Sequence, residues 1–229
     1  MISCIVPVYN NENTIEHVLD VLCSCRDIDE LIVVDDFSTD SSASLLQQHL
    51  GAKVILNERN LGKGGAVVKG IHAARGDTLL LCDADLSTLQ VHHIARLITE
   101  YRSGNYDMVI AGRESNVGWA YLMSLISGER ILPRKAIEPF LPLIAAQGNG
   151  IEQIINFAFQ GKKVKMIINK GVGHIDKWQR GDILNWLPAY AKEAQQLLAT
   201  ELLLGKAFYW PGFYAWLRRI GRAALARIS

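Results

Sequence analysis

The sequence lacks the features of a membrane-spanning, secreted or disordered protein. No apolar stretch reaches the roughly 18 residues that a transmembrane helix needs. Residues 1–8 do not show the basic and then apolar pattern of a signal peptide, so we expect the protein to be neither secreted nor membrane-spanning. With 49% apolar residues in a chain of 229, the composition excludes intrinsic disorder. It indicates one globular domain, with room for a small appendage.

The chain is also poor in cysteine, with four residues that form no paired CxxC sets. Cys4 and Cys82 lie in apolar runs that read as buried strands, and Cys23 and Cys25 complete the set. A domain of this size needs no disulfide scaffold. We therefore expect four reduced thiols, no zinc site and a cytoplasmic protein.

Two nucleotide-binding patterns are missing. The glycine-rich segment Asn60-Leu61-Gly62-Lys63-Gly64-Gly65 has no glycine three residues after Gly64, and no GK[ST] follows it. This excludes the fingerprints of hydride-transfer enzymes and of P-loop hydrolases. The segment still fits either an anion site before a helix or simply a glycine-rich helix start.

No repeat or low-complexity linker interrupts the chain, and the first half alternates two kinds of pattern. Strands are predicted at 2–8, 31–34, 53–56, 78–82 and 107–111, and helices at 12–25, 42–50, 64–74 and 89–101. Such alternation predicts an α/β fold, with a mostly parallel central sheet and helices on both faces.

Beyond Gly112 the pattern is weaker. We predict a helix within 148–161, a strand at 163–168, a long helix at 182–204 and a separate tail, while 131–140 contains two prolines. The proposed organisation is a domain at 1–181, divided into halves 1–114 and 115–181, followed by C-terminal helices at 182–229.

Ligands of open parallel sheets bind beyond the carboxyl ends of the strands. Asp83-Ala84-Asp85 follows a predicted strand, and two carboxylates at this spacing can share Mg²⁺ or Mn²⁺ with phosphate oxygens. Asp27-Ile28-Asp29 has the same spacing but lies at a strand start, so we interpret it as a solvated turn. Asp35 and Asp36 end another strand, where one carboxylate can be structural and the other can bind a base or ribose.

Several further motifs follow one another in a fixed order along the chain. They are Pro7-Val8-Tyr9-Asn10, Val34-Asp35-Asp36-Phe37-Ser38-Thr39-Asp40, Asn60 to Ala66, Ala74-Arg75-Gly76-Asp77, Asp83-Ala84-Asp85, Ala111-Gly112-Arg113 and Ser127-Gly128-Glu129-Arg130. In this order and spacing they resemble the family 2 glycosyltransferases, particularly the branch of polyprenyl-phosphate (dolichyl-phosphate type) sugar transferases. The resemblance covers roughly residues 1 to 176.

The resemblance implies a GT-A fold, a nucleotide-sugar donor and a divalent metal, Mg²⁺ or Mn²⁺. A UDP-sugar is favoured and a GDP-sugar is the alternative. The residues implied in donor binding are Pro7, Tyr9, Glu12, Asp36, Lys63, Asp83 and Arg113, with Asp85 as a metal ligand. One departure concerns Glu12, because relatives carry Glu directly after the Tyr-Asn pair and Asn11 stands there in this chain.

The second half must supply the acceptor side. An inverting transfer needs a carboxylate that removes a proton from the acceptor hydroxyl, whereas a phosphate acceptor needs less help. Glu152 matches the position where relatives place an acidic residue, and Glu129 is the rival base. Glu152 also fits a structural role as an acidic residue at a helix N-terminus.

Three further residues are implied near the metal or diphosphate. His174 follows a predicted strand where several relatives place a metal-binding His, and Lys177 and Arg180 are candidate diphosphate partners. A surface histidine in a solvated basic loop is the alternative. The flanks of His92 and His93 predict an exposed helix face, and no function is assigned to this pair.

The tail, residues 206–229, carries five basic side chains and no acidic one among several aromatics. This pattern is typical of a helix lying in an anionic membrane interface, but packing on the domain or on a second copy in a homodimer fits equally. We therefore expect a cytoplasmic protein that can be peripheral to the membrane, with a lipid-phosphate or other membrane-proximal acceptor. A carbohydrate or a small phosphorylated acid is the alternative acceptor, and nucleic acid is not an expected partner.

The net charge of +1 conceals an uneven distribution. Residues 1–114 hold 9 Lys and Arg against 16 Asp and Glu, a net charge of −7, and residues 115–229 hold 15 against 7, a net charge of +8. The acidic half would bind donor and metal and the basic half the acceptor. Two other functions compete with the transferase: a sugar nucleotidyltransferase, which usually has a glycine-rich loop after its first strand, and a non-catalytic protein of the membrane surface.

Overall fold

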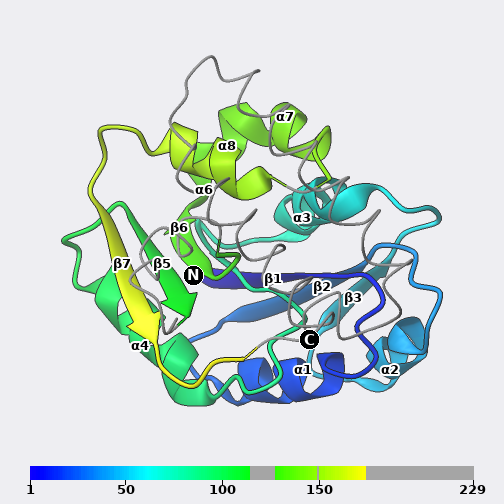
Figure 1. Ribbon diagram of the computed structural model, residues 1–229. Coiled ribbons are helices and arrows are strands. Elements are labelled where there is room, and N and C mark those ends of the chain that lie inside the picture. Colours follow the sequence, from blue (N-terminus) through cyan, green and yellow to red (C-terminus); the bar gives the residue numbers. More distant parts are fainter. Residues whose placement is uncertain (114–126, 149, 174–229) are drawn as a thin grey trace, which may run out of the picture.

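The computed structural model describes residues 1–113, 127–148 and 150–173, and it has the predicted α/β architecture (Figure 1). The strands are β1 (Ile2–Val8), β2 (Glu30–Asp35), β3 (Lys53–Leu56), β4 (Thr78–Leu81), β5 (Met108–Arg113), β6 (Arg130–Pro133) and β7 (Val164–Asn169). The helices are α1 (Ile15–Ser24), α2 (Ser42–Gln48), α3 (Gly62–Ala73), α4 (Val91–Arg102), α6 (Arg134–Ile137), α7 (Leu141–Ala145) and α8 (Ile151–Ala158), with a 3₁₀ turn, η1, at Glu138–Phe140. None of these helices combines the length and apolar character needed to cross a bilayer.

The sheet of the described residues has the strand order β3-β2-β1-β4-β6-β5-β7. β1 pairs in parallel with both β2 and β4, so the strand order reverses at β1. Crevices at such reversals are where open α/β sheets bind ligands. The loops after β1, β2 and β4 all leave this edge, which places the predicted motifs together.

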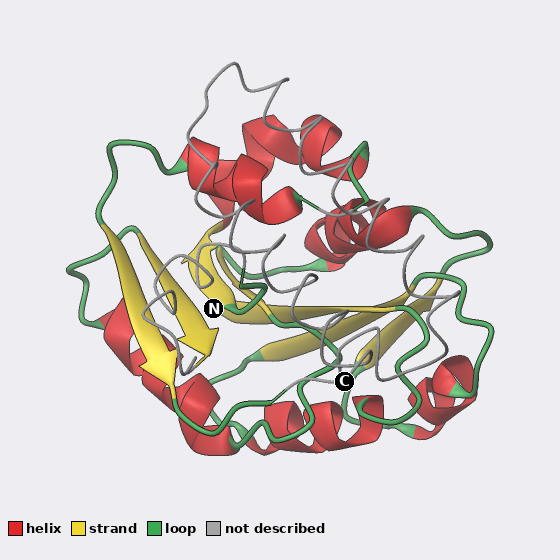
Figure 2. Cartoon of the chain, viewed as in Figure 1, coloured by secondary structure: helices red, strands yellow, loops and turns green. Residues whose placement is uncertain are grey.

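Helices cover both faces of the sheet (Figure 2). Alternate residues of β1 point to opposite faces: Val6 packs in the cluster with α1 and α4, whereas Ile5 packs in the cluster with α3, α7 and α8. Buried side chains on both faces explain why the central strands read as continuous apolar runs. Cys4 and Cys82 are buried as predicted, and burial raises the pKa of both thiols.

The strand β6 is a feature that the sequence interpretation missed. It lies between β4 and β5 and is antiparallel to both. The strand is only four residues long and ends at Pro133, so a segment with two prolines gave no strand pattern. Pro133 tolerates this place because it stands at the end of the strand, opposite Thr78.

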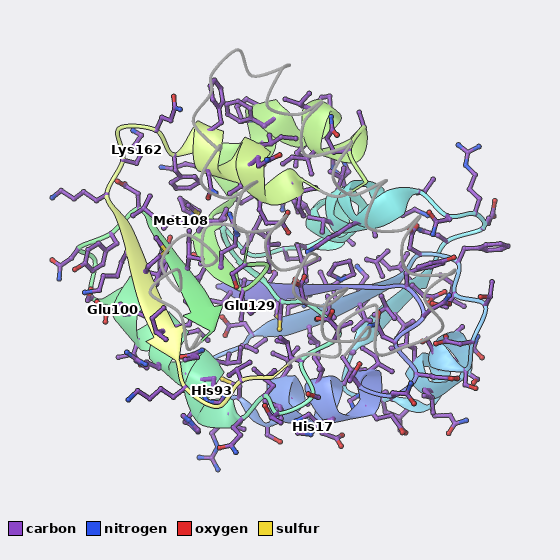
Figure 3. The ribbon with its side chains drawn as sticks, viewed as in Figure 1. His17, His93, Glu100, Met108, Glu129 and Lys162 are labelled. Atoms are coloured by element: carbon purple, nitrogen blue, oxygen red, sulfur yellow. The ribbon has the colours of Figure 1, made fainter. Side chains whose placement is uncertain are left out.

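The prediction of an exposed face at His93 was wrong. Its side chain is buried at the start of α4, 4% exposed, beside the carboxyl end of β7 (Figure 3). Nδ1 accepts a hydrogen bond from the backbone N–H of Gln90, and Nε2 donates to the carbonyl of Lys170. Burial, followed by the neighbouring His92, lowers the pKa of His93. The residue joins α4 to β7 in its neutral form.

The glycine-rich start of α3 packs against another loop. The backbone N–H of Gly64 lies 3.1 Å from the carbonyl oxygen of Gln147, and a Cβ at Gly64 would overlap the carbonyl oxygens of Ile144 and Gln147. The Gly64 amide is therefore used within the protein, which favours the structural reading of this glycine. The contact joins the donor half to the chain just before α8.

We predict that Gly64→Ala lowers the free energy of unfolding by about 2–3 kcal/mol, because the clash is with backbone oxygens that cannot rotate away. Urea unfolding at constant pH measures this loss. Gly161→Ala is the control, since Gly161 has φ +75° and no atom of the described part of the chain lies within 4 Å of its Cβ position. It should lose only about 1 kcal/mol from the left-handed backbone. Equal losses in the two variants would show that α3 does not pack as described.

Candidate active site

The loops that follow β1 and β2 are hydrogen-bonded to each other. The backbone N–H of Asn10 donates to Oγ of Ser38 at 3.0 Å, and the backbone N–H of Thr39 donates to Oδ1 of Asn10 at 2.8 Å. Oε2 of Glu12 accepts from the backbone N–H of Ser41 at 3.0 Å. Glu12 thus contributes to the loop pairing, whatever else it binds.

The paired carboxylates at the end of β2 have different surroundings. Asp36 is buried, and its Oδ1 accepts hydrogen bonds from Nδ2 of Asn57 at 2.8 Å and from the backbone N–H of Leu61 at 2.7 Å. Asp35 accepts from the backbone N–H of Ser38 through Oδ2, and its buried Oδ1 has no hydrogen-bond partner among the described residues. Both carboxylates therefore shape the loops of this edge.

Lys63 joins the two halves of the site. Its Nζ lies 2.7 Å from Oδ1 of Asp83, after β4, and 2.7 Å from Oε1 of Glu152, at the start of α8. The Lys63 and Asp83 side chains are 24% exposed and that of Glu152 is 10% exposed. One ammonium group thus bridges a predicted donor residue and the predicted base.

The charge of Lys63 is stabilised by its two partners. Burial alone would lower the pKa of its ammonium group, but Asp83 and Glu152 more than offset this, so that the pKa is raised. A raised pKa keeps Lys63 protonated at neutral and moderately alkaline pH. The two salt bridges therefore persist over the range in which enzymes are normally assayed.

These three residues line one pocket together with Pro7, the last but one residue of β1, which is paired with Val34 of β2. Gly128 closes the pocket, since a Cβ there would overlap the carboxylate of Asp83. The residues lining the pocket come from both halves of the chain. Proline, lysine and two carboxylates that are far apart in sequence are thus brought to one place.

Arg130 also lines the pocket. Its side chain is fully buried, and its guanidinium donates to the carbonyl of Ser127, to Oδ1 of Asn156 at 3.0 Å and to the carbonyl of Glu152 at 3.4 Å. These bonds tie the turn that contains Gly128 to the helix that carries Glu152. A buried arginine used in this way fixes the backbone on both sides of the pocket.

Asp85 lies in a loop that two other segments hold in place. Oγ1 of Thr14 donates to the carbonyl of Ala84 at 2.8 Å. Further along the loop, the backbone N–H of Ser87 donates to the carbonyl of Gly173 at 3.0 Å. Asp83 and Asp85 supply the hard oxygen donors that Mg²⁺ or Mn²⁺ prefers, so the residues present fit such an ion. No group of three acidic, histidine or cysteine ligands occurs within the described ranges.

Comparison with protein families decides what this site belongs to. Residues 3–143 match the model described as "Glycosyl transferase family 2". The chain belongs to glycosyl transferase family 2. The match includes the strands β1 to β6 and the loops that carry Pro7, Asp36, Lys63, Asp83 and Asp85.

Family members of similar sequence include enzymes named for lipid-phosphate acceptors. The chain is 40% identical over 119 residues to the undecaprenyl-phosphate 4-deoxy-4-formamido-L-arabinose transferase of Pectobacterium atrosepticum, covering 47% of this chain and 35% of that protein. It is 31% identical over 122 residues to the glycosyltransferase AglD of Haloferax volcanii, covering 49% of this chain and 19% of that protein. The matched segment is thus only about a third or less of these relatives.

Solved structures show the fold. Glucosyl-3-phosphoglycerate synthase of Mycobacterium tuberculosis, in complex with Mn²⁺, UDP-glucose and phosphoglyceric acid, has a TM-score of 0.70 and 24% identity, covering 89% of this chain and 79% of that chain. The same enzyme was also solved with Mg²⁺ and UDP, at 23% identity. The GT-A fold expected for this family 2 chain is confirmed.

The remaining predicted residues of this family 2 protein lie around the pocket or outside the described residues. Tyr9 is 48% exposed at the end of β1. Glu129 is buried directly before β6 (labelled in Figure 3), where its backbone carbonyl accepts a hydrogen bond from Ala111 of β5, and its Oε2 lies 2.5 Å from Oγ of Ser127. Arg113 ends β5, and its side chain is not among those that the structure describes. His174, Lys177, Arg180, the helices predicted at 182–204 and the tail at 206–229 are also outside the described residues.

Sequence reasoning missed the parts played by Gly128 and Arg130, which were noticed only as members of a motif. A signal was present, because an arginine directly before the apolar pair Ile131 and Leu132 is unusual at the start of a buried strand. The bond between Lys63 and Glu152 had no such signal, since 89 residues separate the two.

We predict that Lys63→Met lowers the free energy of unfolding by about 2–4 kcal/mol at pH 7, because it leaves two partly buried carboxylates without their cation. The loss should be the same at pH 9, because the raised pKa keeps Lys63 charged there; its contribution falls only when the pH rises above about 10. Urea unfolding at both pH values measures it.

Lys69→Met is the matched control on the same helix. Nζ of Lys69 bonds the neutral Oδ1 of Asn57, so this variant also loses one charge but separates no carboxylate from its cation. It should lose about 1 kcal/mol. If both variants lose the same amount, or if the Lys63→Met loss disappears by pH 9, the double salt bridge does not stabilise the protein.

Proposed function

We propose that this chain is a metal-dependent glycosyltransferase that moves a sugar from a nucleoside-diphosphate donor, with a UDP-sugar favoured, to a lipid-phosphate acceptor. One observation carries the proposal: Lys63 brings Asp83 and Glu152 together in a pocket that Pro7 also lines. A direct sugar transfer needs a carboxylate on the donor side and a carboxylate on the acceptor side, and here both lie beside one cation.

On the donor side, the loops after β1 and β2 would hold the nucleoside. Tyr9 offers an exposed ring there, and Asp36 is fixed by Asn57 and Leu61 at the base of the loop. Asp83 would bind the ribose or the sugar. The ammonium of Lys63, at the first turn of α3, offers positive charge to the diphosphate.

A divalent cation would be held by Asp85, with Asp83 beside it, and when bound it would neutralise the diphosphate leaving group. Gly173 is bonded to the loop of Asp85 through Ser87, so the chain leaves the described part of the structure at this loop. The position of Gly173 beside this loop supports His174, the next residue, as a second metal ligand. Lys177 and Arg180 are proposed as diphosphate partners from the sequence alone.

On the acceptor side, Glu152 would accept the proton of an attacking hydroxyl. Lys63 bonds Oε1, and the proton would go to Oε2. The guanidinium of Arg130 fixes the carbonyl of Glu152 and thereby the start of α8. Glu129 is the alternative base, and it is buried within bonding distance of Ser127.

The acceptor has two candidate classes. The relative from Pectobacterium atrosepticum is named for undecaprenyl phosphate, which favours a lipid phosphate. The structural neighbour was solved with phosphoglyceric acid, which favours a small phosphorylated acid as the second candidate. Both are phosphate-bearing acceptors, and the basic half of this chain suits either. Membrane binding through 206–229, a homodimer and the division into halves at 114 stay predictions.

Nucleoside diphosphates test the donor class directly. We expect UDP to raise the Tm by about 3 °C or more when Mn²⁺ is present, and by much less in its absence, because Mn²⁺ held by Asp85 and Asp83 would offset the charge of the diphosphate. Asp85→Ala should lose the metal-dependent part. Differential scanning fluorimetry with UDP, GDP, ADP and CDP, each with and without Mn²⁺, measures the shifts.

Asp27→Ala is the control, since Asp27 belongs to the same Asp-x-Asp spacing away from the pocket. It should keep the full metal-dependent shift. If no nucleoside diphosphate produces a metal-dependent shift in the unaltered protein, the transferase proposal fails at donor binding.

We predict that Glu152→Gln lowers kcat by about 100-fold or more with a hydroxyl acceptor, because glutamine cannot take the proton. With a phosphate acceptor the loss should be smaller, since the nucleophile is already an anion. Glu138→Gln, at an exposed salt bridge with Arg134, should leave kcat unchanged. Steady-state transfer assays measure the three variants, and a larger loss for Glu129→Gln would make Glu129 the base.

A further inference from the structure

The backbone at Phe37 is strained. Among the described residues, Phe37 and Asn10 are the non-glycine residues with positive φ, at +66° and +54°. Asparagine tolerates this left-handed region, but a positive φ at a bulky residue such as Phe37 is a genuine outlier. Both residues lie in the paired loops that follow β2 and β1.

The surrounding hydrogen bonds enforce this conformation. The carbonyl of Asp36, which precedes Phe37, accepts from Nδ2 of Asn60 at 3.1 Å. The backbone N–H of Ser38, which follows it, donates to Oδ2 of Asp35 at 3.2 Å. The peptide groups on both sides of Phe37 are therefore fixed, and the loop would be satisfied by a glycine at this position.

The backbone strain at Phe37 is not offset by packing of its side chain in the core. It is 50% exposed and belongs to neither hydrophobic cluster. Strained residues that the fold does not need are found mostly at functional sites. We therefore expect the ring to contact a partner that is not part of the described fold.

The position of Phe37 indicates which partner. Val8 and Asp35 are paired across the parallel strands, so Tyr9 and Phe37 follow adjacent strand ends. Asp36, which directly precedes Phe37, accepts a hydrogen bond from the backbone N–H of Leu61, two residues before Lys63. A flat, half-exposed ring at this edge offers a stacking surface for a flat ligand, and a nucleobase is the flat part of the proposed donor.

We propose that Phe37 is a base-stacking residue that helps to select the donor nucleotide, with the strained backbone of its loop holding the ring in place. This inference rests on the proposed nucleotide-sugar donor and adds a residue to that site. It predicts that Phe37→Gly raises the stability of the protein and lowers its affinity for the nucleotide, because glycine would relieve the strain and remove the ring.

The test compares Phe37→Gly and Phe37→Tyr with the unaltered full chain. Phe37→Gly should raise the Tm without nucleotide by about 1–3 °C, because the left-handed backbone suits glycine. It should weaken UDP binding in the presence of Mn²⁺ about tenfold, the range of one base–aromatic contact. Phe37→Tyr keeps the ring and should bind UDP within about twofold. Isothermal titration calorimetry measures the affinities.

Inorganic pyrophosphate is the second probe, because it lacks a base. Its affinity in the presence of Mn²⁺ should be the same for Phe37→Gly and the unaltered protein. Gly104→Phe is the reverse control: Gly104 has φ +74° with no described atom within 4 Å of its Cβ position, and it precedes β5, which β4 and β6 separate from β1 in the sheet. It should lower the Tm and leave UDP affinity unchanged.

The outcomes separate this inference from the proposed function. If the unaltered protein binds UDP and Phe37→Gly binds it equally well, the stacking role is overturned and the donor class stands. If Phe37→Gly loses binding to anionic vesicles and not to UDP, the ring serves a membrane surface and the inference is overturned as well. If the unaltered protein binds no nucleoside diphosphate, both proposals fail together.

Discussion

The site depends on one partly buried ammonium group. Lys63 makes two salt bridges of 2.7 Å, and its partners come from loops that are separate in sequence and adjacent in the fold. Carboxylates as close as Asp83 and Glu152 repel each other unless a cation lies between them. Lys63 therefore permits the donor side and the acceptor side to meet, and the close contact of Gly64 with Gln147 keeps its helix in the position this requires.

Much of this arrangement could be predicted from the sequence. Alternating strand and helix patterns predicted the parallel core of the sheet, and from it the edge where ligands bind. The residues Pro7, Lys63, Asp83 and Glu152 were each assigned to the site, and the structure brings them to one pocket. The reason is physical: the carboxyl ends of parallel strands point the same way, so motifs that follow them converge.

The rest could not be predicted, because it depends on contacts between distant segments. No local pattern indicates that Lys63 reaches Glu152, and a four-residue strand with a terminal proline is too short to show a period. The burial of Arg130 and His93 depends on carbonyl groups of Ser127 and Lys170, which only the folded chain brings near. Polar residues that are buried by satisfying backbone groups look like surface residues in a sequence.

The antiparallel strand β6 has a consequence for how the molecule can be divided. It pairs with β4 on one side and β5 on the other, so the first five strands cannot form a continuous sheet without a segment that follows them in the chain. A fragment ending near residue 113 would expose the edges of β4 and β5, and such open edges promote aggregation. The sheet therefore draws strands from both sides of residue 114, where the net charge of the chain changes sign.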